Sequence, residues 1–497
     1  MNRTIVPLTH EAPGTCQPAR SWVVICLIAA IILGTVVPVS ATTSSALATF
    51  ATTSSSFAAF PTPTSSLATS PTPTSSLTTS PTPPASPTYI IEVDNVPIVF
   101  DTEPIVQNNR LLVPFRAIAE SLGIAVEWLQ ETRTVKAVGE GKTVLLSIDS
   151  SHAIVIETPS DNIDFAESGI SGESALSPVS TTRVPLDALP VVSNNRVLIP
   201  LRFFAETFGC TVWYDAPVRT AEVRSPYKDL EILAWYAMDE NWQSLFGAPY
   251  PSVATGGTDV VDTVSFGWYE LAETGELTTT GTQGWRKPSG WEYALNAARD
   301  LGLNTEMTVW MSDRTGSLTR LMADPAAHEA AADAIATAAA DYDSVNLDLE
   351  GLGLTDTGEV LALVRNTYTA FVTGVAARLH AQGKTLTLTL HPLNGAYHGY
   401  DYAAVGAIAD RIAIMAYDYG TRPEPHEQVV AAVDLALSVV PAEKLLLGIS
   451  LASESAESLV SKLGIAKRKG IAGVALWRLG LMHEDDWSAL RLRYQVP

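Results

Sequence analysis

Three polar residues alternate with apolar ones in the stretch YDSVNLDLEG at residues 342–351. Asn346, Asp348 and Glu350 are spaced two apart, so in a β-strand their side chains share one face. Two carboxyl groups on neighbouring positions of that face, roughly 6–7 Å apart, are costly to bury unless they are paired or used. The spacing predicts acid–base chemistry here. The alternative is a fully hydrogen-bonded polar layer without catalysis.

The elements around this strand predict an α/β fold, a (β/α)8 barrel over residues 227–497. Helical patterns, including residues 326–340, 359–382 and 454–470, alternate with short apolar stretches, and residues 273–284 predict a loop. Glu350 falls at the carboxyl end of its strand, where barrel enzymes hold their active sites. A doubly wound sheet is the alternative, but the sequence has no glycine-rich phosphate loop. The eight candidate strands are 230–238, 259–268, 304–310, 343–350, 384–391, 411–419, 444–450 and 473–477.

Three of these strands carry motifs of a known family. DSVNLDLE at 343–350 resembles the DxxDxDxE signature of glycoside hydrolase family 18, the family of chitinases and endo-β-N-acetylglucosaminidases. MAYDY at 415–419 is similar to the family's Met-x-Tyr-Asp motif, and Trp477 in GVALW ends the eighth strand with an aromatic residue, as in the family. The variant VNLDLE most resembles the spore-germination and cortex-lytic branch. The resemblance implies a glycosidase acting on β-linked N-acetylglucosamine glycans without a cofactor.

The same resemblance implies roles for four side chains. Glu350 would be the general acid. Asp348 would orient the substrate's 2-acetamido group and stabilise its positive charge, and its proximity would raise the pKa of the acid. Tyr417 would hydrogen-bond the acetamido oxygen, and Trp477 would form the apolar floor under the sugar. The family uses the acetamido group itself as nucleophile, so no protein nucleophile is required.

Other positions depart from the family or leave alternatives open. Asn346 stands where many chitinases have an aspartate, and we expect it to hydrogen-bond Asp348 and to alter the pH dependence. Asp343 and Asp418 match family positions either as substrate contacts or as caps of local structure. Further candidates for substrate contact, with ordinary packing as the alternative, are Trp235, Tyr236, Trp268, Tyr269, His391 and Met415.

Residues 89–225 contain an internal repeat. NNRLLVPFRAIAESLGIAVEW begins at Asn108 and NNRVLIPLRFFAETFGCTVWY at Asn194. Each copy predicts a turn, a helix opened by proline, a glycine C-cap and a pair of strands. The pattern resembles the copper amine oxidase N-terminal (stalk) domain family. No quinone-cofactor catalytic domain follows, so neither copper nor amine oxidation is implied. We expect Arg116 and Arg202 to form ion pairs on their own helices rather than to bind wall polymers.

The N-terminal segments predict export. Residues 1–41 read as a signal peptide cleaved after Ala41, with an uncleaved membrane anchor as the alternative. Residues 42–88 are a Pro/Ser/Thr-rich, low-complexity linker, which favours an extended spacer. The protein is therefore expected outside the cell or at the cell envelope. This location places peptidoglycan ahead of chitin as the expected substrate.

Composition limits the possible partners. The formal net charge of -22 disfavours nucleic acids and anionic membrane surfaces as partners. We expect contact with a membrane only through the possible N-terminal anchor. The three cysteines form no zinc motif, and Cys210 is expected to be a buried thiol. We expect a monomer with a polysaccharide partner and no metal. The alternative to an enzyme is a catalytically silent glycan-binding or wall-structural module, which Glu350 argues against.

Overall fold

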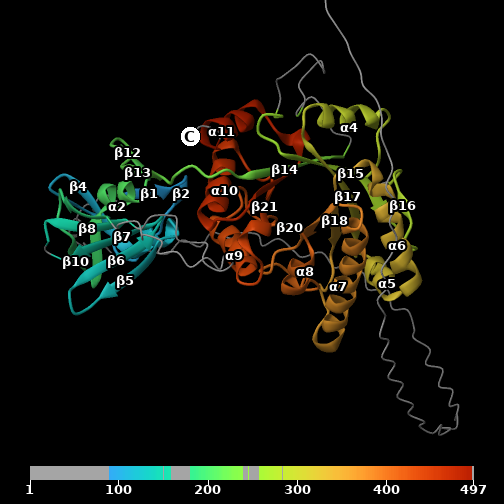
Figure 1. The fold of residues 1–497 in the computed structure, drawn as a ribbon, viewed down its shortest axis with the longest axis horizontal. Coiled ribbons are helices and arrows are strands. Elements are labelled where there is room, and N and C mark those ends of the chain that lie inside the picture. The colour runs from blue at the N-terminus through green and yellow to red at the C-terminus, as the bar shows by residue number, and fades with distance from the viewer. Residues whose placement is uncertain are drawn as a thin grey trace, which may run out of the picture. The chain divides into compact units, whose positions relative to one another are not determined.

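A computed structural model describes residues 89–148, 150–157, 180–238, 245, 257–281 and 284–494. The segments expected to be signal and linker, 1–41 and 42–88, lie outside these ranges. The described residues form a duplicated domain and a closed barrel (Figure 1).

The two copies of the repeat have the same local structure. In each copy a strand ends in a proline at the helix N-cap, and the helix is followed by a glycine in the left-handed region, Gly123 (φ 70°) or Gly209 (φ 80°). A pair of strands then follows, as predicted. The equivalent elements are β4 (Arg110–Pro114), α1 (Phe115–Ser121), β5 (Ala125–Leu129) and β6 (Thr134–Gly139) in the first copy, and β11 (Arg196–Pro200), α2 (Leu201–Thr207), β12 (Thr211–Asp215) and β13 (Thr220–Arg224) in the second.

The copies pair through equivalent strands. β4 and β11 are antiparallel, with Leu112 opposite Pro200 and Pro114 opposite Leu198. Two reciprocal ion pairs join the copies, Arg110 to Asp187 at 2.8 Å and Arg196 to Asp101 at 2.6 Å. The duplication has therefore produced one domain with a shared core rather than two separate units.

The helix arginines have local partners. Arg116 lies 3.8 Å from Glu120, and Arg202 lies 3.9 Å from Glu206, each one turn along its own helix. This agrees with the role that we preferred for them. Cys210 is buried in the core of the domain, also as expected, and burial raises the pKa of its thiol to about 12.

The remaining strands of the domain complete three sheets. Their orders are β10-β11-β4-β3, β12-β13-β1-β2 and β5-β6-β7-β8-β9. The strands not yet given are β1 (Ile90–Val93), β2 (Val96–Pro97), β3 (Ile105–Gln107), β7 (Lys142–Ser147), β8 (His152–Glu157), β9 (Ser180–Pro185) and β10 (Val191–Ser193).

Eight parallel strands close the barrel, because β14 pairs with both β15 and β22. All eight strands expected from the sequence are present, but the sixth ends at Ile414, so residues 415–419 form a loop. The expected loop at 273–284 contains the short strand β16 (Leu277–Thr278), which pairs with β15. The barrel strands are β14 (Glu231–Ala237), β15 (Thr263–Leu271), β17 (Asn304–Ser312), β18 (Ser344–Glu350), β19 (Thr385–Leu390), β20 (Arg411–Ile414), β21 (Leu445–Ser450) and β22 (Gly473–Trp477).

Helices lie outside these strands (Figure 1). The three segments predicted to be helical from the sequence correspond to α6, α7 and α10. The helices are α4 (Trp291–Asp300), α5 (Ser317–Ala323), α6 (Pro325–Ala338), α7 (Gly358–His380), α8 (Tyr402–Ile408), α9 (His426–Leu437), α10 (Ala456–Lys469) and α11 (Glu484–Tyr494).

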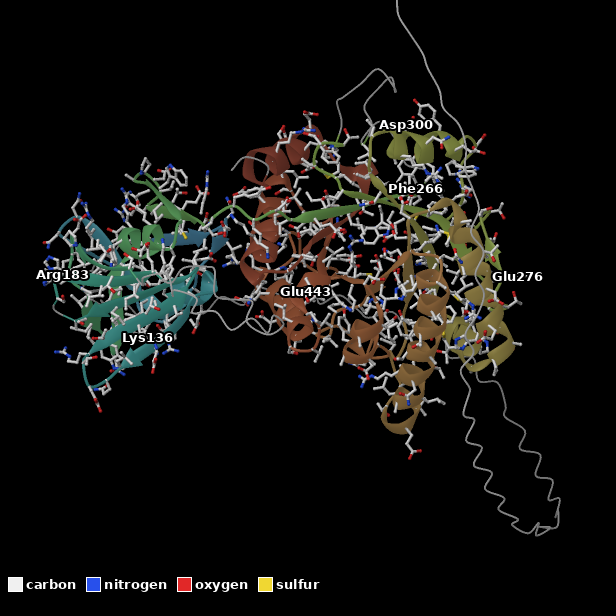
Figure 2. The ribbon with its side chains drawn as sticks, in the orientation of Figure 1. Lys136, Arg183, Phe266, Glu276, Asp300 and Glu443 are labelled. Carbon is white, nitrogen blue, oxygen red and sulfur yellow. The ribbon has the colours of Figure 1, made fainter. Side chains whose placement is uncertain are left out.

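Apolar side chains are buried among the strands of the barrel, and many charged side chains lie on its surface. Figure 2 shows Phe266 among the strands, where it is fully buried, and Glu276 and Asp300 at the edge of the barrel, where both are exposed. The barrel interior has two halves. Residues from β14, β20, β21 and β22 fill one half with apolar groups, namely Leu233, Trp235, Ala413, Leu446 and Ala475. The other half, from β15, β17, β18 and β19, contains buried polar residues, among them Ser265, Glu306, Asn346 and Thr387.

Candidate active site

The strand β18 has the alternation that the sequence predicted. Val345, Leu347 and Leu349 are buried in the main core, which also contains side chains of the surrounding helices. Asn346 and Asp348 are buried on the other face, and Glu350, at the end of the strand, is partly exposed. The three polar residues therefore share the inner face of the barrel, but they have different surroundings.

Asn346 belongs to a hydrogen-bonded polar layer centred on Glu306 of β17. Asn346 Nδ2 donates to Glu306 Oε1 at 2.9 Å, and Asn346 Oδ1 accepts from Thr389 Oγ1 at 2.8 Å. Glu306 is 0% exposed and also accepts hydrogen bonds from Ser265 (2.8 Å), Ser344 (3.3 Å) and Thr387 (2.6 Å).

The expected bond from Asn346 to Asp348 is therefore not found. The amide is engaged by groups on the neighbouring strands β17 and β19, which the sequence pattern of β18 does not report. Asn346 is fully buried and does not line the cleft described below, so it supports the site from beneath rather than contacting substrate.

Asp348 is buried as well, but it does not take part in the hydrogen-bonded layer around Glu306. Its side chain is 4% exposed, and Oδ1 has no hydrogen-bond partner among the residues that the structure describes. Burial, followed by the nearby charge of Glu350, raises the pKa of the Asp348 carboxyl well above its ordinary value. Asp348 also lines the cleft described below, and a buried oxygen without a partner at such a residue is a position where a ligand can supply the missing donor.

Glu350 is oriented by a tryptophan. Trp310 Nε1, on β17, donates to Glu350 Oε1 at 3.0 Å. The Trp310 ring stacks on Trp285, with centroids 5.4 Å apart and planes 7° from parallel, and Trp285 in turn stacks on Trp477 at 5.6 Å. Burial raises the pKa of Glu350, and the Trp310 hydrogen bond opposes that rise.

Glu350 lies where three hollows meet at the carboxyl end of the barrel. One, of about 480 Å³, is lined by Asp348, Tyr417 and Trp477. The second, of about 600 Å³, is lined by the stacked tryptophans and Arg314, and the third, of about 580 Å³, by Arg314 and His391. Because all three share Glu350, open space continues on more than one side of this carboxyl group.

Several of the predicted contacts line the first hollow. Trp235, Met415 and Asp418 do so together with Tyr417. Trp235 packs edge-on against Trp477, with ring centroids 5.7 Å apart, and its Nε1 is buried with no partner in the described part of the chain. Burial raises the pKa of Tyr417 well above its ordinary value, so its hydroxyl keeps its proton and can act as a hydrogen-bond donor.

Three predicted sugar-stacking residues lie outside the cleft. Tyr236 is 4% exposed and Trp268 1% exposed, and both pack with Phe266 in the core that contains the barrel helices. Their rings face away from the barrel interior, because they have the opposite strand parity to Trp235 and Ser265. Tyr269 is also buried, and its hydroxyl accepts a hydrogen bond from Lys287 Nζ at 2.7 Å. These three residues pack the wall of the barrel instead of contacting substrate.

Two further candidates have structural partners. Asp343 Oδ2 accepts from Thr305 N at 2.9 Å and Thr305 Oγ1 at 2.8 Å, so this carboxylate ties β17 to β18. His391 lines the cleft but accepts a hydrogen bond from the Gly351 amide at 3.2 Å. Burial lowers the pKa of His391 to about 4, so its ring is neutral at neutral pH.

The sequence reasoning missed Trp310, Trp285, Arg314 and Glu306. The sequence contained a signal for Glu306 and Trp310. Together with Thr308 they are spaced two apart along β17, with apolar residues between them, in the same way as Asn346, Asp348 and Glu350 along β18. Arg314 and Trp285 lie in loops, whose placement no local pattern gives.

The fold and site define a (β/α)8-barrel protein with a carboxyl pair in an aromatic-walled cleft at the carboxyl ends of its strands. Comparison with known proteins gives a family for one part of the chain and similar proteins for the chain as a whole. Residues 92–223 match the family model of the copper amine oxidase N-terminal domain, which confirms the resemblance of that segment. The chain is also 29% identical over 120 residues to the putative sporulation-specific glycosylase YdhD of Bacillus subtilis. That match covers 22% of this chain and 27% of the relative's length.

The solved structures that are similar to this chain include those of a spore cortex-lytic enzyme and of a chitinase. The spore cortex-lytic enzyme SleL of Bacillus cereus aligns over 55% of this chain and 76% of its own, with 18% identity and a TM-score of 0.44. A chitinase from Chromobacterium violaceum aligns over 53% of this chain and 98% of its own, with 19% identity and a TM-score of 0.42. The barrel itself is established by the strand pairing of this chain.

Proposed function

We propose that this protein is a glycoside hydrolase that cleaves β-linked N-acetylglucosamine glycans by substrate-assisted, retaining catalysis. One observation carries the proposal. Asp348, with an unsatisfied oxygen, and Glu350, with a raised pKa, open into one cleft whose wall also contains Tyr417 and Trp477. The putative glycosylase with 29% identity agrees with this reaction class.

The first step requires a protonated Glu350. Burial favours the neutral carboxyl, and because the indole N–H of Trp310 occupies Oε1, Oε2 is left to carry the acidic proton. Glu350 gives this proton to the glycosidic oxygen as the bond to the anomeric carbon breaks. The substrate's acetamido oxygen attacks the anomeric carbon from the opposite face, forming an oxazolinium-like intermediate.

Asp348 and Tyr417 serve the acetamido group in this scheme. Asp348 Oδ1, which no residue of the described ranges engages, accepts the acetamido N–H, and the positive charge that develops on the group favours the ionised form of Asp348. Tyr417 donates to the acetamido oxygen and holds it in line with the anomeric carbon. Glu350, now ionised, removes a proton from water, which opens the intermediate with overall retention of configuration.

Arg314 supports peptidoglycan rather than chitin as the substrate. It lines two of the hollows that meet at Glu350, and no ion pair to another side chain within the described ranges occupies it. Arg320, which shares one of these hollows, is already bound by Glu273 through contacts of 2.7 and 2.8 Å. Alternate sugars of peptidoglycan carry a lactyl group, whose carboxyl is either free or joined to a stem peptide that has carboxylates of its own. Chitin carries neither group, so only peptidoglycan offers Arg314 an anion.

The test is to incubate the full chain with peptidoglycan glycan strands, with chitin oligomers and with cello-oligomers, and to identify the products by mass. We expect cleavage of the first two, slower for chitin, and none of the glucan without acetamido groups. NMR of the first product should show the β-anomer. Inverted products would exclude the mechanism, and binding without cleavage would favour the glycan-binding alternative.

We also propose that the protein acts outside the cell or at the cell envelope, brought there by residues 1–41. The apolar segment and the following small residues support this location. Fractionation of the producing cells, with N-terminal sequencing of the mature protein, distinguishes a chain beginning at Thr42 from one that keeps its anchor. A full-length chain in the cytoplasm would contradict the proposal.

A further inference from the structure

The loop that follows β20 carries Tyr417 and Asp418, and Asp418 has an uncommon backbone conformation. Asp418 has a φ of 65°, in the left-handed region that most residues with a Cβ rarely adopt and that Asp adopts more often than most of them. Such a conformation persists only where surrounding contacts impose it. The position of Tyr417 at the cleft therefore depends on whatever holds the peptide units that follow it.

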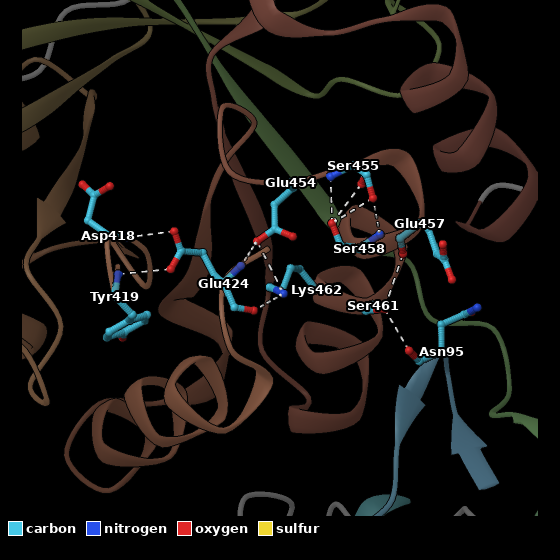
Figure 3. Close-up of polar contacts among 10 residues, drawn as sticks. All are labelled: Asn95, Asp418, Tyr419, Glu424, Glu454, Ser455, Glu457, Ser458, Ser461 and Lys462. Atoms are coloured by element: carbon cyan, nitrogen blue, oxygen red, sulfur yellow. Dashed lines mark hydrogen bonds and ion pairs between the residues drawn. The ribbon is translucent and has the colours of Figure 1, made fainter. Parts of the chain in front are cut away.

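A buried carboxylate holds them. Glu424 Oε1 accepts from the backbone N–H of Asp418 at 3.1 Å, and Glu424 Oε2 accepts from that of Tyr419 at 3.1 Å (Figure 3). Successive backbone N–H groups around a left-handed residue form a concave site for an anion, and here the protein supplies its own anion. Glu424 is almost fully buried.

Glu424 is fixed in turn by an ion pair from the neighbouring elements. Its backbone N–H donates to Glu454 Oε1 at 3.2 Å, and its carbonyl oxygen accepts from Lys462 Nζ at 2.8 Å. Lys462, on α10, lies 3.4 Å from Glu454 Oε1, and their side chains are only 3% and 2% exposed. Figure 3 shows these contacts as a continuous chain from α10 to the loop at Asp418.

We infer that Glu424, held by Glu454 and Lys462, is a positioning residue that sets Tyr417 and Asp418 at the catalytic cleft. The inference rests on the proposed function for its effect on the reaction. Burying three charged groups is costly, and apolar residues of similar volume often give equal or greater stability. The placement of these charges around the strained loop indicates that they serve its geometry.

The decisive variant is Glu424→Gln, which keeps the size of the side chain. An amide offers one acceptor oxygen and presents its NH2 group to the second backbone N–H, so it satisfies only one of the two peptide units. We expect kcat to fall about 10- to 100-fold, the range for a displaced catalytic group, with KM little changed. If this variant fails to fold, the double variant Lys462→Met with Glu454→Gln removes the ion pair without leaving a lone charge.

An activated substrate separates positioning of Tyr417 from damage to the acid. An aryl N-acetylglucosaminide with a good leaving group needs little help from Glu350, but it still needs its acetamido group held. The loss in Glu424→Gln should therefore persist on this substrate. A loss caused by misplacing Glu350 would largely disappear.

Ser461→Ala is the matched control on the same helix. Ser461 is adjacent to Lys462, and its Oγ donates to Asn95 O of the duplicated domain at 2.8 Å, away from the loop (Figure 3). This variant removes the contacts of Ser461 Oγ with Asn95 O and with Glu457 O, neither of which involves Glu424. It should leave kcat on both substrates unchanged.

A readout independent of activity is the ¹⁹F NMR signal of Tyr417 in the full chain labelled with 3-fluorotyrosine, assigned with Tyr417→Phe. The signal should shift or broaden in Glu424→Gln and remain in place in Ser461→Ala. An unmoved signal with unchanged kcat overturns the inference, as does an equal change in both variants. If the wild type cleaves none of the glycans, the proposed function fails, while the signal still decides whether Glu424 holds the loop.

Discussion

The indole N–H of Trp310 donates to Glu350 Oε1 at 3.0 Å, so a residue on β17 orients the carboxyl group that ends β18. This hydrogen bond lowers the pKa of Glu350 against the larger effect of burial, which raises it. Trp310 thus limits how far the pKa of the acid rises and engages one of its two oxygens, Oε1.

Trp310→Phe tests this relationship. The phenyl ring keeps a surface for stacking on Trp285 but donates no hydrogen bond. A protonated acid is active below its pKa, and loss of the hydrogen bond raises that pKa further. We expect the high-pH limb of the kcat/KM profile to move to higher pH and kcat at neutral pH to fall about 10-fold as the acid loses its orientation. Trp285→Phe, which alters the stack alone, should leave the limb in place.

Glu350→Gln should remove the proton donor while preserving binding. We expect kcat on glycan strands to fall at least about 100-fold, as is typical for loss of general acid catalysis. The loss should be much smaller on an aryl glycoside whose leaving group needs no proton. The dissociation constant for a chitin oligomer, measured by calorimetry, should change little. Undiminished turnover would remove Glu350 from the mechanism.

Asp348→Asn should slow cleavage but stabilise the fold. The folded state raises the pKa of Asp348, so folding favours its protonated form. Between the unfolded and folded pKa values the folded state binds more protons, and stability falls as pH rises through this window. Asparagine is never ionised and escapes that loss. We expect the variant to be about 1–2 kcal/mol more stable than wild type at pH 7.

The measurement is denaturant unfolding at pH 4 and pH 7. The gain from Asp348→Asn should shrink at the lower pH, where the wild-type carboxyl is also protonated. In parallel, a thiazoline mimic of the cyclic intermediate should bind the variant more weakly, because the compensating negative charge is gone. A variant less stable than wild type at pH 7 would show that Asp348 is better solvated than its burial indicates.

Arg314→Gln should alter substrate choice. If Arg314 binds the carboxylate carried by peptidoglycan, kcat/KM on glycan strands should fall about 10-fold or more, while kcat/KM on a neutral chitin oligomer of equal length stays the same. Strands stripped of stem peptides expose the lactyl carboxylate, and intact strands carry the carboxylates of the peptide. Comparing the two identifies which anion is bound.

Arg320→Gln is the control, because that arginine is already paired with Glu273. Any change in kcat/KM that Arg320→Gln causes should be the same on charged and on neutral glycans. If Arg314→Gln lowers kcat/KM by the same factor on glycan strands and on the neutral chitin oligomer, Arg314 acts on Glu350 rather than on the substrate.

Much of the architecture was predictable from local patterns. The alternation in VNLDLE placed Asp348 and Glu350 on the inner face of β18, and the repeated segments gave two copies of the same strand and helix. Strands and helices have short periods, so a few residues reveal which side chains share a face. The eight barrel strands could be counted for the same reason.

Only the tertiary structure decided which residues meet. Asn346 has the same period and polarity as Asp348, yet Glu306 and Thr389 from adjacent strands bind Asn346, whereas Asp348 Oδ1 has no partner among the residues that the structure describes. Trp235 and Tyr236 are both aromatic neighbours on β14, but one lies inside the barrel and the other under its helices. Strands buried on both faces are apolar on both, so their sequence cannot say which face is inward. That choice, like the support of Asp418 by Glu424, depends on contacts between distant segments, which exist only after the barrel closes.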